Sequence, residues 1–304
     1  MKKFNLKSKK LLTTALFLTS GLTILSHSNP VNATDACPDP STITSPNDFG
    51  DGTSFIATTG GSCYGTPEEY GVTIYKMGLC TSNPAPSSAG SAPDTSSCSF
   101  NFEKDDGEPA SFASGGEVDL SEEYSSRPEV GEYEFAYIEI NKTFNVKASY
   151  GPIGDAARTT YFTNGTITEA GTVTGASTTP TASDGYVTTE APLTTFGFLD
   201  GGGSVCDATG EESVTGGTIR AYLLDSSDTL IANDSSATEC SGVKKLLGIM
   251  QLDTKVNITA ATTSVKTTFK VENNGTSVVY NDTADGIRFD LSLIHISEPT
   301  RLLS

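Results

Sequence analysis

The stretch TFNVKASY, residues 143–150, decides the fold class of this chain. Its apolar and polar side chains alternate without a break, which is the pattern of a β-strand with one buried and one solvated face. Such a strand has to lie on a sheet that covers a core. The positions expected to be buried are Phe144, Val146, Ala148 and Tyr150.

The segment just before this strand is also expected to be extended. Residues 132–140, EYEFAYIEI, are rich in aromatic and branched side chains, which favour strands. Only Asn141 and Lys142 separate the two runs, so the sequence predicts a hairpin with a tight turn. Three alternating aromatic residues form either core packing or a ligand-contact patch: Tyr133, Phe135 and Tyr137.

A second hairpin is predicted around the Asn-Gly dipeptide at 274–275. These two residue types readily adopt the positive φ angles of a type I′ turn. Counting outward from the turn pairs Val271 with Val278 and Phe269 with Tyr280. Both pairs fall on the same face of the hairpin.

Strand signals continue along the chain, and no stretch shows a sustained helical stripe. The run 244–252 is expected to be a strand or a short helix, since Gly248 is its only breaker. The sequence therefore predicts an all-β fold of one or two antiparallel β-sandwich domains, stapled by disulfides and preceded by a signal peptide. The expected domain bounds are 34–155 and 156–290. Further strands are expected at 71–79, 99–103, 159–163, 186–189, 194–199, 218–224 and 255–261.

Residues 1–33 have the organisation of a secretory signal peptide. Lysines at positions 2, 3, 7, 9 and 10 precede a mostly apolar run, and small residues around Ala33 offer a cleavage site. The apolar run, residues 11–25, is too short for a membrane span. We therefore expect an exported protein, extracellular, periplasmic or on the cell surface, with no transmembrane segment.

The last stretch, residues 291–304, differs in character from the rest. Leu291–Arg301 resembles, residue for residue, a translated adapter from transposase-based sequencing libraries. We therefore expect residues 291–304 to be an artefact, with the native chain ending in view near Asp290. The alternative is a native C-terminal strand with a tail.

Histidine and tryptophan set limits on the chemistry. The two histidines are His27, inside the expected signal peptide, and His295, inside the expected artefact. The exported part therefore offers no imidazole for a catalytic triad, a zinc site or a general base. The chain also has no tryptophan, the side chain that binds cations and stacks on rings most strongly. These absences argue against the usual serine, cysteine and zinc hydrolases.

The chain is strongly acidic, with a formal net charge of −18. Phosphate-rich partners would be repelled, so nucleic acid and anionic membranes are not expected as partners. The charge serves solubility or, alternatively, the binding of a cation or a basic partner. The expected partner is an unidentified surface or extracellular ligand.

All six cysteines lie in the exported part, which predicts three disulfides. A thiolate metal site is the alternative, but no Cys-x-x-Cys pair supports it. Pairing of nearest neighbours gives Cys37–Cys63, Cys80–Cys98 and Cys206–Cys240.

Acidic loops are the candidate metal sites. Carboxylates on a turn can surround Ca²⁺ with oxygen ligands, although turns use the same residues for their own hydrogen bonds. No other cofactor is expected. The candidate ligands are Asp48, Asp51, Asp105, Asp106, Asp282 and Asp285, and Asp225–Asp228 forms a further acidic turn.

No catalytic motif stands out in the sequence. Glu132 and Glu134 lie two apart on an expected strand, hence on one face at about 7 Å, a spacing that suits an inverting glycosidase. A solvated strand face has the same pattern. We therefore expect a non-enzymatic secreted or cell-surface protein with a structural, adhesive or ligand-contact role. The alternatives are a secreted carbohydrate hydrolase that uses this carboxylate pair and a calcium-stiffened structural module.

Overall fold

The computed structural model shows an all-β chain built from antiparallel sheets. It describes residues 36–42, 62–112, 125–153, 159–165, 172–174, 187–197, 205–214, 216–262, 264–268, 275–281, 286–291 and 298–303. The expected signal peptide, residues 1–33, lies outside this part. The strands are β1 (Ser62–Gly65), β2 (Glu69–Cys80), β3 (Cys98–Ser111), β4 (Gly131–Asn141), β5 (Thr143–Lys147), β6 (Ser149–Ile153), β7 (Thr159–Phe162), β8 (Thr172–Thr174), β9 (Thr189–Pro192), β10 (Thr209–Val214), β11 (Gly217–Leu224), β12 (Lys245–Ile258), β13 (Ser264–Thr268), β14 (Thr276–Asn281), β15 (Gly286–Leu291) and β16 (Glu298–Leu303).

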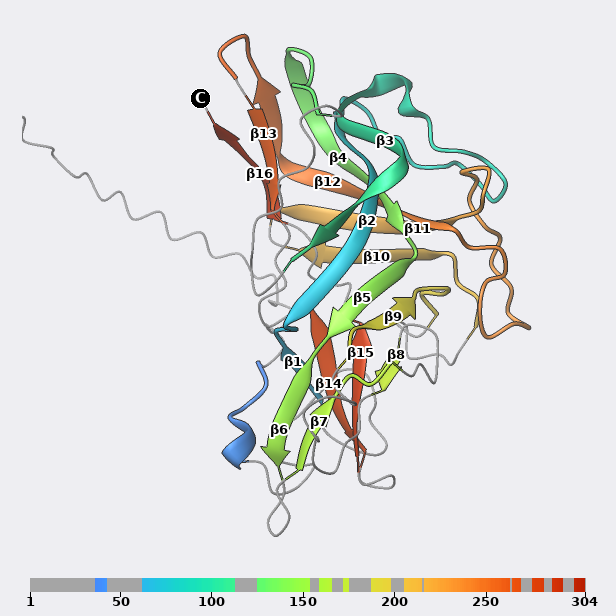
Figure 1. Cartoon of the computed structure of the whole chain (residues 1–304). Helices are drawn as coiled ribbons and strands as arrows, with labels where there is room; N and C mark the ends of the chain where they lie inside the picture. Colours follow the sequence, from blue (N-terminus) through green and yellow to red (C-terminus); the bar gives the residue numbers. More distant parts are fainter. Residues whose placement is uncertain are drawn as a thin grey trace, which may run out of the picture. The chain divides into compact units, whose positions relative to one another are not determined.

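The largest sheet has eight strands in the order β10-β11-β12-β4-β2-β5-β9, and β3 joins it by pairing with β2 (Figure 1). Strand β2 organises this sheet because both of its edges are used. One edge pairs with β3 along most of its length. The other edge pairs first with β5 and then with β4.

The hairpin predicted at Asn141 and Lys142 is wrong. Both β4 and β5 pair antiparallel with β2, so the two strands run in the same direction and continue one another. Asn141 supports the bend between them, since its Oδ1 accepts a hydrogen bond from the Thr143 backbone N–H at 2.8 Å. Beyond this bend the outer neighbour changes from β12 to β9. Asn141 and Lys142 thus form a kink between β4 and β5, which pair one after the other with the same edge of β2.

The alternation in residues 143–150 is confirmed. All four apolar side chains of this stretch are buried, and the Phe144 ring packs on Tyr70 with 5.6 Å between the ring centroids. The intervening polar residues are partly or fully exposed. One face of this segment therefore belongs to the core, as the period of two requires.

The ambiguous run 244–252 is a strand. It forms the first half of β12, which lies between β11 and β4 inside the sheet. Leu246, Leu247, Ile249 and Met250 are all buried, so both faces of the strand are covered and the apolar run is continuous rather than alternating. The same strand includes part of the segment expected at 255–261, beyond a shift in register.

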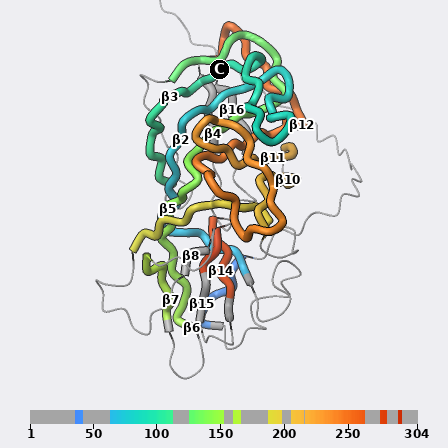
Figure 2. Tube along the Cα trace, turned by 90° about the vertical axis from the view of Figure 1, so that its right-hand side faces the viewer, coloured from blue at the N-terminus to red at the C-terminus, as the bar shows by residue number. Residues whose placement is uncertain are grey.

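A second sheet has four strands in the order β1-β14-β15-β8. Figure 2 shows β14 and β15 running side by side. Val278, for which the sequence predicts pairing with Val271, lies opposite Cys63 on one edge and Phe289 on the other. Residues 269–274, which contain the other half of the predicted hairpin, lie outside the described part of the chain.

The expected artefact at 291–304 takes part in two strands. Leu291 is the last residue of β15 and is buried. Strand β16 pairs antiparallel with β13 in a separate two-stranded sheet. The origin of this segment stays a prediction.

The described strands show no division at residue 155, where a boundary between two sandwich domains is expected. Strands β2 to β5 precede that point and β9 to β12 follow it, yet they share the eight-stranded sheet. A single hydrophobic cluster extends in sequence from Cys63 to Leu291. Residues Thr34–Ser304 group into one compact unit, and the division into two domains stays a prediction.

The three predicted disulfides are all present, and they close sequence separations of 26, 18 and 34 residues. No cysteine is free, so the alternative of a thiolate metal site is wrong. In the loop-entropy model a bond across such a separation stabilises the fold by about 3 kcal/mol.

Candidate functional site

A cluster of three charged side chains, one of them buried, lies where β12 begins. Lys245 Nζ lies 2.6 Å from Glu139 Oε1 and 2.7 Å from Asp228 Oδ1. The Glu139 side chain is 3% exposed, that of Lys245 21% and that of Asp228 43%. A buried carboxylate is costly unless it is paired, and Lys245 supplies the partner. We call these three residues the lysine cluster.

Three parts of the chain bring the lysine cluster together. Glu139 comes from β4, Lys245 is the first residue of β12, and Asp228 lies in the turn that follows β11. In the ladder between β4 and β12, Lys245 is opposite Asn141 and Leu247 is opposite Glu139. Lys245 and Glu139 are therefore diagonal neighbours on one face of the sheet, within reach of long side chains.

Asp225 shapes the turn that presents Asp228. Its carboxylate accepts hydrogen bonds from the backbone N–H groups of Ser227 at 2.8 Å and Thr229 at 3.0 Å, and from the Thr229 hydroxyl at 2.9 Å. These bonds, the one from the Thr229 backbone foremost, lower the pKa of Asp225. Asp228 itself has a φ of 59°, a left-handed conformation that Asp tolerates. This acidic turn thus uses one carboxylate to close itself and directs the other towards Lys245.

Two tyrosines contact the lysine cluster. The Tyr137 hydroxyl donates a hydrogen bond to Glu139 Oε2 at 3.1 Å. The Tyr75 ring centroid lies 4.9 Å from Lys245 Nζ, a distance at which the ring face attracts a cation. Asn141 Nδ2 donates to the Tyr75 hydroxyl at 2.9 Å. Both oxygens of Glu139 are thereby engaged, Oε1 by Lys245 and Oε2 by Tyr137.

The protonation states in the lysine cluster follow from these contacts. Burial lowers the pKa of Lys245, but Asp228 and Glu139 outweigh it and raise that pKa above its ordinary value. Burial, followed by the charge of Glu139, raises the pKa of Tyr137. At neutral pH Lys245 is therefore a cation and Tyr137 a hydrogen-bond donor.

A second ion pair lies beside the lysine cluster. Lys76 in β2 is opposite Glu139 in the ladder, and its Nζ lies 2.9 Å from Glu103 Oε1. Burial lowers the pKa of Lys76, but the hydrogen bond to Glu103 and the charges of Glu103, Glu139 and Asp228 raise it overall. The lysine cluster and this ion pair together contain three carboxylates and two ammonium groups.

The carboxylate pair suggested by the sequence does not join this cluster. Glu132 is exposed, and Glu134 forms an ion pair with Lys255 at 2.6 Å, with side chains 45% and 56% exposed. Both lie on the solvated side of β4. The hydrolase alternative therefore has two surface carboxylates, one of which is held by a lysine.

The aromatic row on β4 is core packing. Tyr133, Phe135 and Tyr137 are all buried. The Tyr137 ring meets Phe100 edge-on, with 5.4 Å between the ring centroids, and the Tyr133 hydroxyl donates to the Glu129 carbonyl at 2.9 Å. The interpretation of this row as a ligand-contact patch is wrong.

Asp105 and Asp106 do not form the turn that the sequence suggests. They are exposed within the long strand β3, where the register with β2 shifts between Ile74 and Lys76. Gly107 next to them has a φ of +71°, and a Cβ there would lie 2.4 Å from Thr73 Cγ2. The acidic residues thus mark a bulge on a strand rather than a closed loop.

The other candidate calcium ligands fall outside the described part of the chain: Asp48, Asp51, Asp282 and Asp285. Within the described residues no group of three or more His, Cys, Asp or Glu side chains is arranged to hold a metal ion. The calcium interpretation stays a prediction for all six candidate residues.

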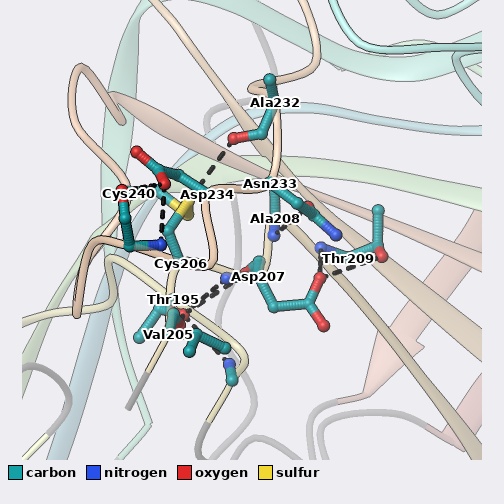
Figure 3. The surroundings of a disulfide bond; sticks show 12 residues. Thr195, Val205, Cys206, Asp207, Ala208, Thr209, Ala232, Asn233, Asp234 and Cys240 are labelled. Carbon is teal, nitrogen blue, oxygen red and sulfur yellow. Dashed lines mark hydrogen bonds between the residues drawn. A yellow bond between two sulfur atoms is a disulfide. The ribbon is translucent and has the colours of Figure 1, made fainter.

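The disulfide Cys206–Cys240 anchors a second polar region (Figure 3). The Thr195 hydroxyl donates to the Val205 carbonyl and accepts from the Asp207 backbone N–H at 2.9 Å and the Gly197 N–H at 3.0 Å. These bonds join two loops, so the strand predicted at 194–199 is wrong for its described residues. The contacts around this disulfide are structural.

The alternation pattern of β4 could have pointed to one member of the lysine cluster. Glu139 continues the series of buried positions formed by Tyr133, Phe135 and Tyr137. A carboxylate in that series has to find a cation. What the sequence does not reveal is that Lys245, so distant along the chain, supplies it.

Within the described residues no helix is long and apolar enough to cross a membrane. Comparison with protein-family models, with curated proteins and with solved structures finds no match for this chain.

Proposed function

We propose that this is an exported, non-enzymatic β-sheet protein that acts as a rigid structural or adhesive element on the outside of a cell. The observation that carries the proposal is the set of three disulfides, which brace a chain with a secretory N-terminal pattern. Disulfides of this kind are typical of oxidising compartments.

The way the charged side chains are used supports a contact role. Glu139, Asp225 and Asp228 bond within the protein rather than presenting free groups to a substrate. The acidic surface would keep the protein soluble and would favour cations or basic partners. A rigid sheet with exposed polar loops suits adhesion or assembly better than turnover of a substrate.

The test compares turnover with binding. The full chain is produced with its disulfides, incubated with a panel of soluble polysaccharides, and passed over immobilised matrix proteins and glycans. We expect export of the oxidised chain, retention on at least one surface and no polysaccharide cleavage. Cleavage by the wild type that is lost in a folded Glu132→Gln, Glu134→Gln chain would establish the hydrolase and overturn the proposal.

The calcium alternative is tested in parallel by thermal melts. If the protein is a plain disulfide-braced element, its melting midpoint is the same with excess Ca²⁺ and with a chelator. A midpoint that falls on chelation would favour the calcium-stiffened module instead.

A further inference from the structure

The position of Lys245 between two carboxylates allows covalent chemistry as well as ion pairing. We propose that Lys245 Nζ condenses with the side-chain carboxyl group of Asp228 to form an intramolecular amide cross-link, with Glu139 as the group that carries the proton. This cross-link goes beyond the proposed function, because it can form whether or not the protein is an adhesin.

The contact between Lys245 and Asp228 is a close ion pair. Nζ lies 2.7 Å from Oδ1, yet this oxygen accepts no hydrogen bond of acceptable angle from the described residues. The carboxyl carbon is bonded to Oδ1, so the nitrogen is held next to the group that it would attack, and such positioning favours reaction. By contrast, Lys245 donates a well-formed hydrogen bond to Glu139 Oε1 at 2.6 Å.

Water is kept from the reacting oxygen. Although the Asp228 side chain is partly exposed, its Oδ1 atom is buried. The Tyr75 ring covers the ammonium group, and Asp225 holds the turn in place through its bonds to Ser227 and Thr229. Condensation releases water, so a site that excludes water favours the amide over its hydrolysis.

The step balances without any co-reactant. Glu139 takes one proton from the Lys245 ammonium group, and the neutral amine attacks Asp228 Cγ. The N–C bond forms, one C–O bond of the carboxyl group breaks, and the departing oxygen leaves as water with two protons that were on the nitrogen, one of them delivered by Glu139. No atom is oxidised or reduced.

The product has fewer charges in the lysine cluster, and Glu139 exchanges the counter-charge of Lys245 for that of the neighbouring Lys76. The reaction replaces a partly buried cation and anion by one neutral amide, which removes the cost of keeping two charges away from water. The Tyr137 hydroxyl continues to donate to Glu139. Lys76, opposite Glu139 in the ladder, remains as the neighbouring cation. Holding the two groups in contact supplies the effective concentration that free amines and carboxylates lack in water.

The same two strands carry a control pair. Lys255 Nζ lies 2.6 Å from Glu134 Oε1, but both side chains are about half exposed. No described second carboxylate bonds to Lys255 to relay a proton, and water surrounds the pair. Lys255 is therefore expected to keep a free amine.

Intact mass spectrometry of the full chain, reduced and denatured, tests the cross-link. We compare wild type, Lys245→Arg and Lys255→Arg, all processed in the same way. Lys255→Arg should be heavier than wild type by the residue difference alone, whereas Lys245→Arg should be heavier by that difference plus one water molecule. Resistance to trypsin establishes that the Lys255→Arg chain folds, whereas the mass of Lys245→Arg is informative whether or not that variant folds. Equal increments in Lys245→Arg and a folded Lys255→Arg overturn the proposal.

A fourth chain, Glu139→Gln, tests the proton carrier. Without the proton carrier the cross-link should not form, so the mass of this chain should include the water molecule that the wild type has lost. Resistance to trypsin shows whether the chain folds. A folded Glu139→Gln chain that has still lost the water overturns the role of Glu139. A folded chain that retains it supports the role, and Glu134→Gln should keep the cross-link.

Discussion

Two lysines of β12 pair with two glutamates of β4 at the same distance, yet the two pairs differ in their surroundings. Lys245 and Glu139 lie 2.6 Å apart with side chains 21% and 3% exposed, and Lys255 and Glu134 lie 2.6 Å apart with side chains 56% and 45% exposed. Distance alone would rank them as equal. The difference is that water reaches one pair and hardly reaches the other.

The backbone explains why the two ends of this strand pair differ. The ladder between β4 and β12 is regular from Lys245 to Gln251 and then shifts in register before Val256. Lys255 thus lies where the pairing is interrupted, a place typical of bends at a sheet edge or end. At the regular end, the turn around Asp228 and the ring of Tyr75 close over the lysine. The comparison shows that the contribution of an ion pair to stability, and its reactivity, depend on how far the surrounding residues exclude water from it.

The largest effect is expected from removing the buried cation. Lys245→Met leaves Glu139 in the interior without its counter-charge, and a broken buried pair typically costs about 3 kcal/mol or more. Urea unfolding should show this loss in the free energy of unfolding. In a chain that carries the amide with Asp228, Lys245 is already neutral, and the change then removes a covalent cross-link rather than a counter-charge.

Adding Glu139→Leu to Lys245→Met sharpens this result. The double change removes the stranded charge, and an apolar pair of similar volume should regain most of the stability. If the single change costs less than about 1 kcal/mol, the surroundings of Lys245 are as wet as those of Lys255 and the comparison between the two pairs fails.

The next largest effect is expected from alkaline pH, which should lower the free energy of unfolding through Tyr137. Burial and the charge of Glu139 raise the pKa of Tyr137 above its ordinary value of 10.0, so above that pH the unfolded chain loses a proton that the native chain keeps. The stability from this group is complete below pH 10 and falls by about 1.4 kcal/mol per pH unit above it.

Denaturant unfolding at stepped pH, with Tyr137→Phe beside the wild type, isolates this contribution. The variant should lose less stability than wild type between neutral pH and pH values above the ordinary tyrosine pKa. Parallel curves for the two chains would show that the pKa of Tyr137 is not raised in the native chain.

The smallest effect is expected at the exposed end. Lys255→Met should change the free energy of unfolding by less than about 1 kcal/mol, because exposed pairs are solvated and mobile. High salt should remove most of that difference by screening. A salt-independent loss as large as that of Lys245→Met would contradict the comparison.

The pattern-based predictions succeeded where the physics is local. Alternation identified the buried face of residues 143–150, and the even number of cysteines, paired as nearest neighbours, predicted all three disulfides. The turn signal at Asn141 failed because residue preferences report a local bend, whereas β2 decided that β5 continues β4 instead of folding back.

The sequence by itself determined that the chain forms antiparallel strands, which faces are apolar and which cysteines are near enough along the chain to pair. Only the tertiary structure decided which charges meet. Glu139, Asp228 and Lys245 lie in separate segments, and their contact depends on the register of β4 with β12 and on the turn after β11. The physical reason is that patterning arises from each residue's own preference for water, while pairing of charges depends on strand neighbours that no local pattern encodes.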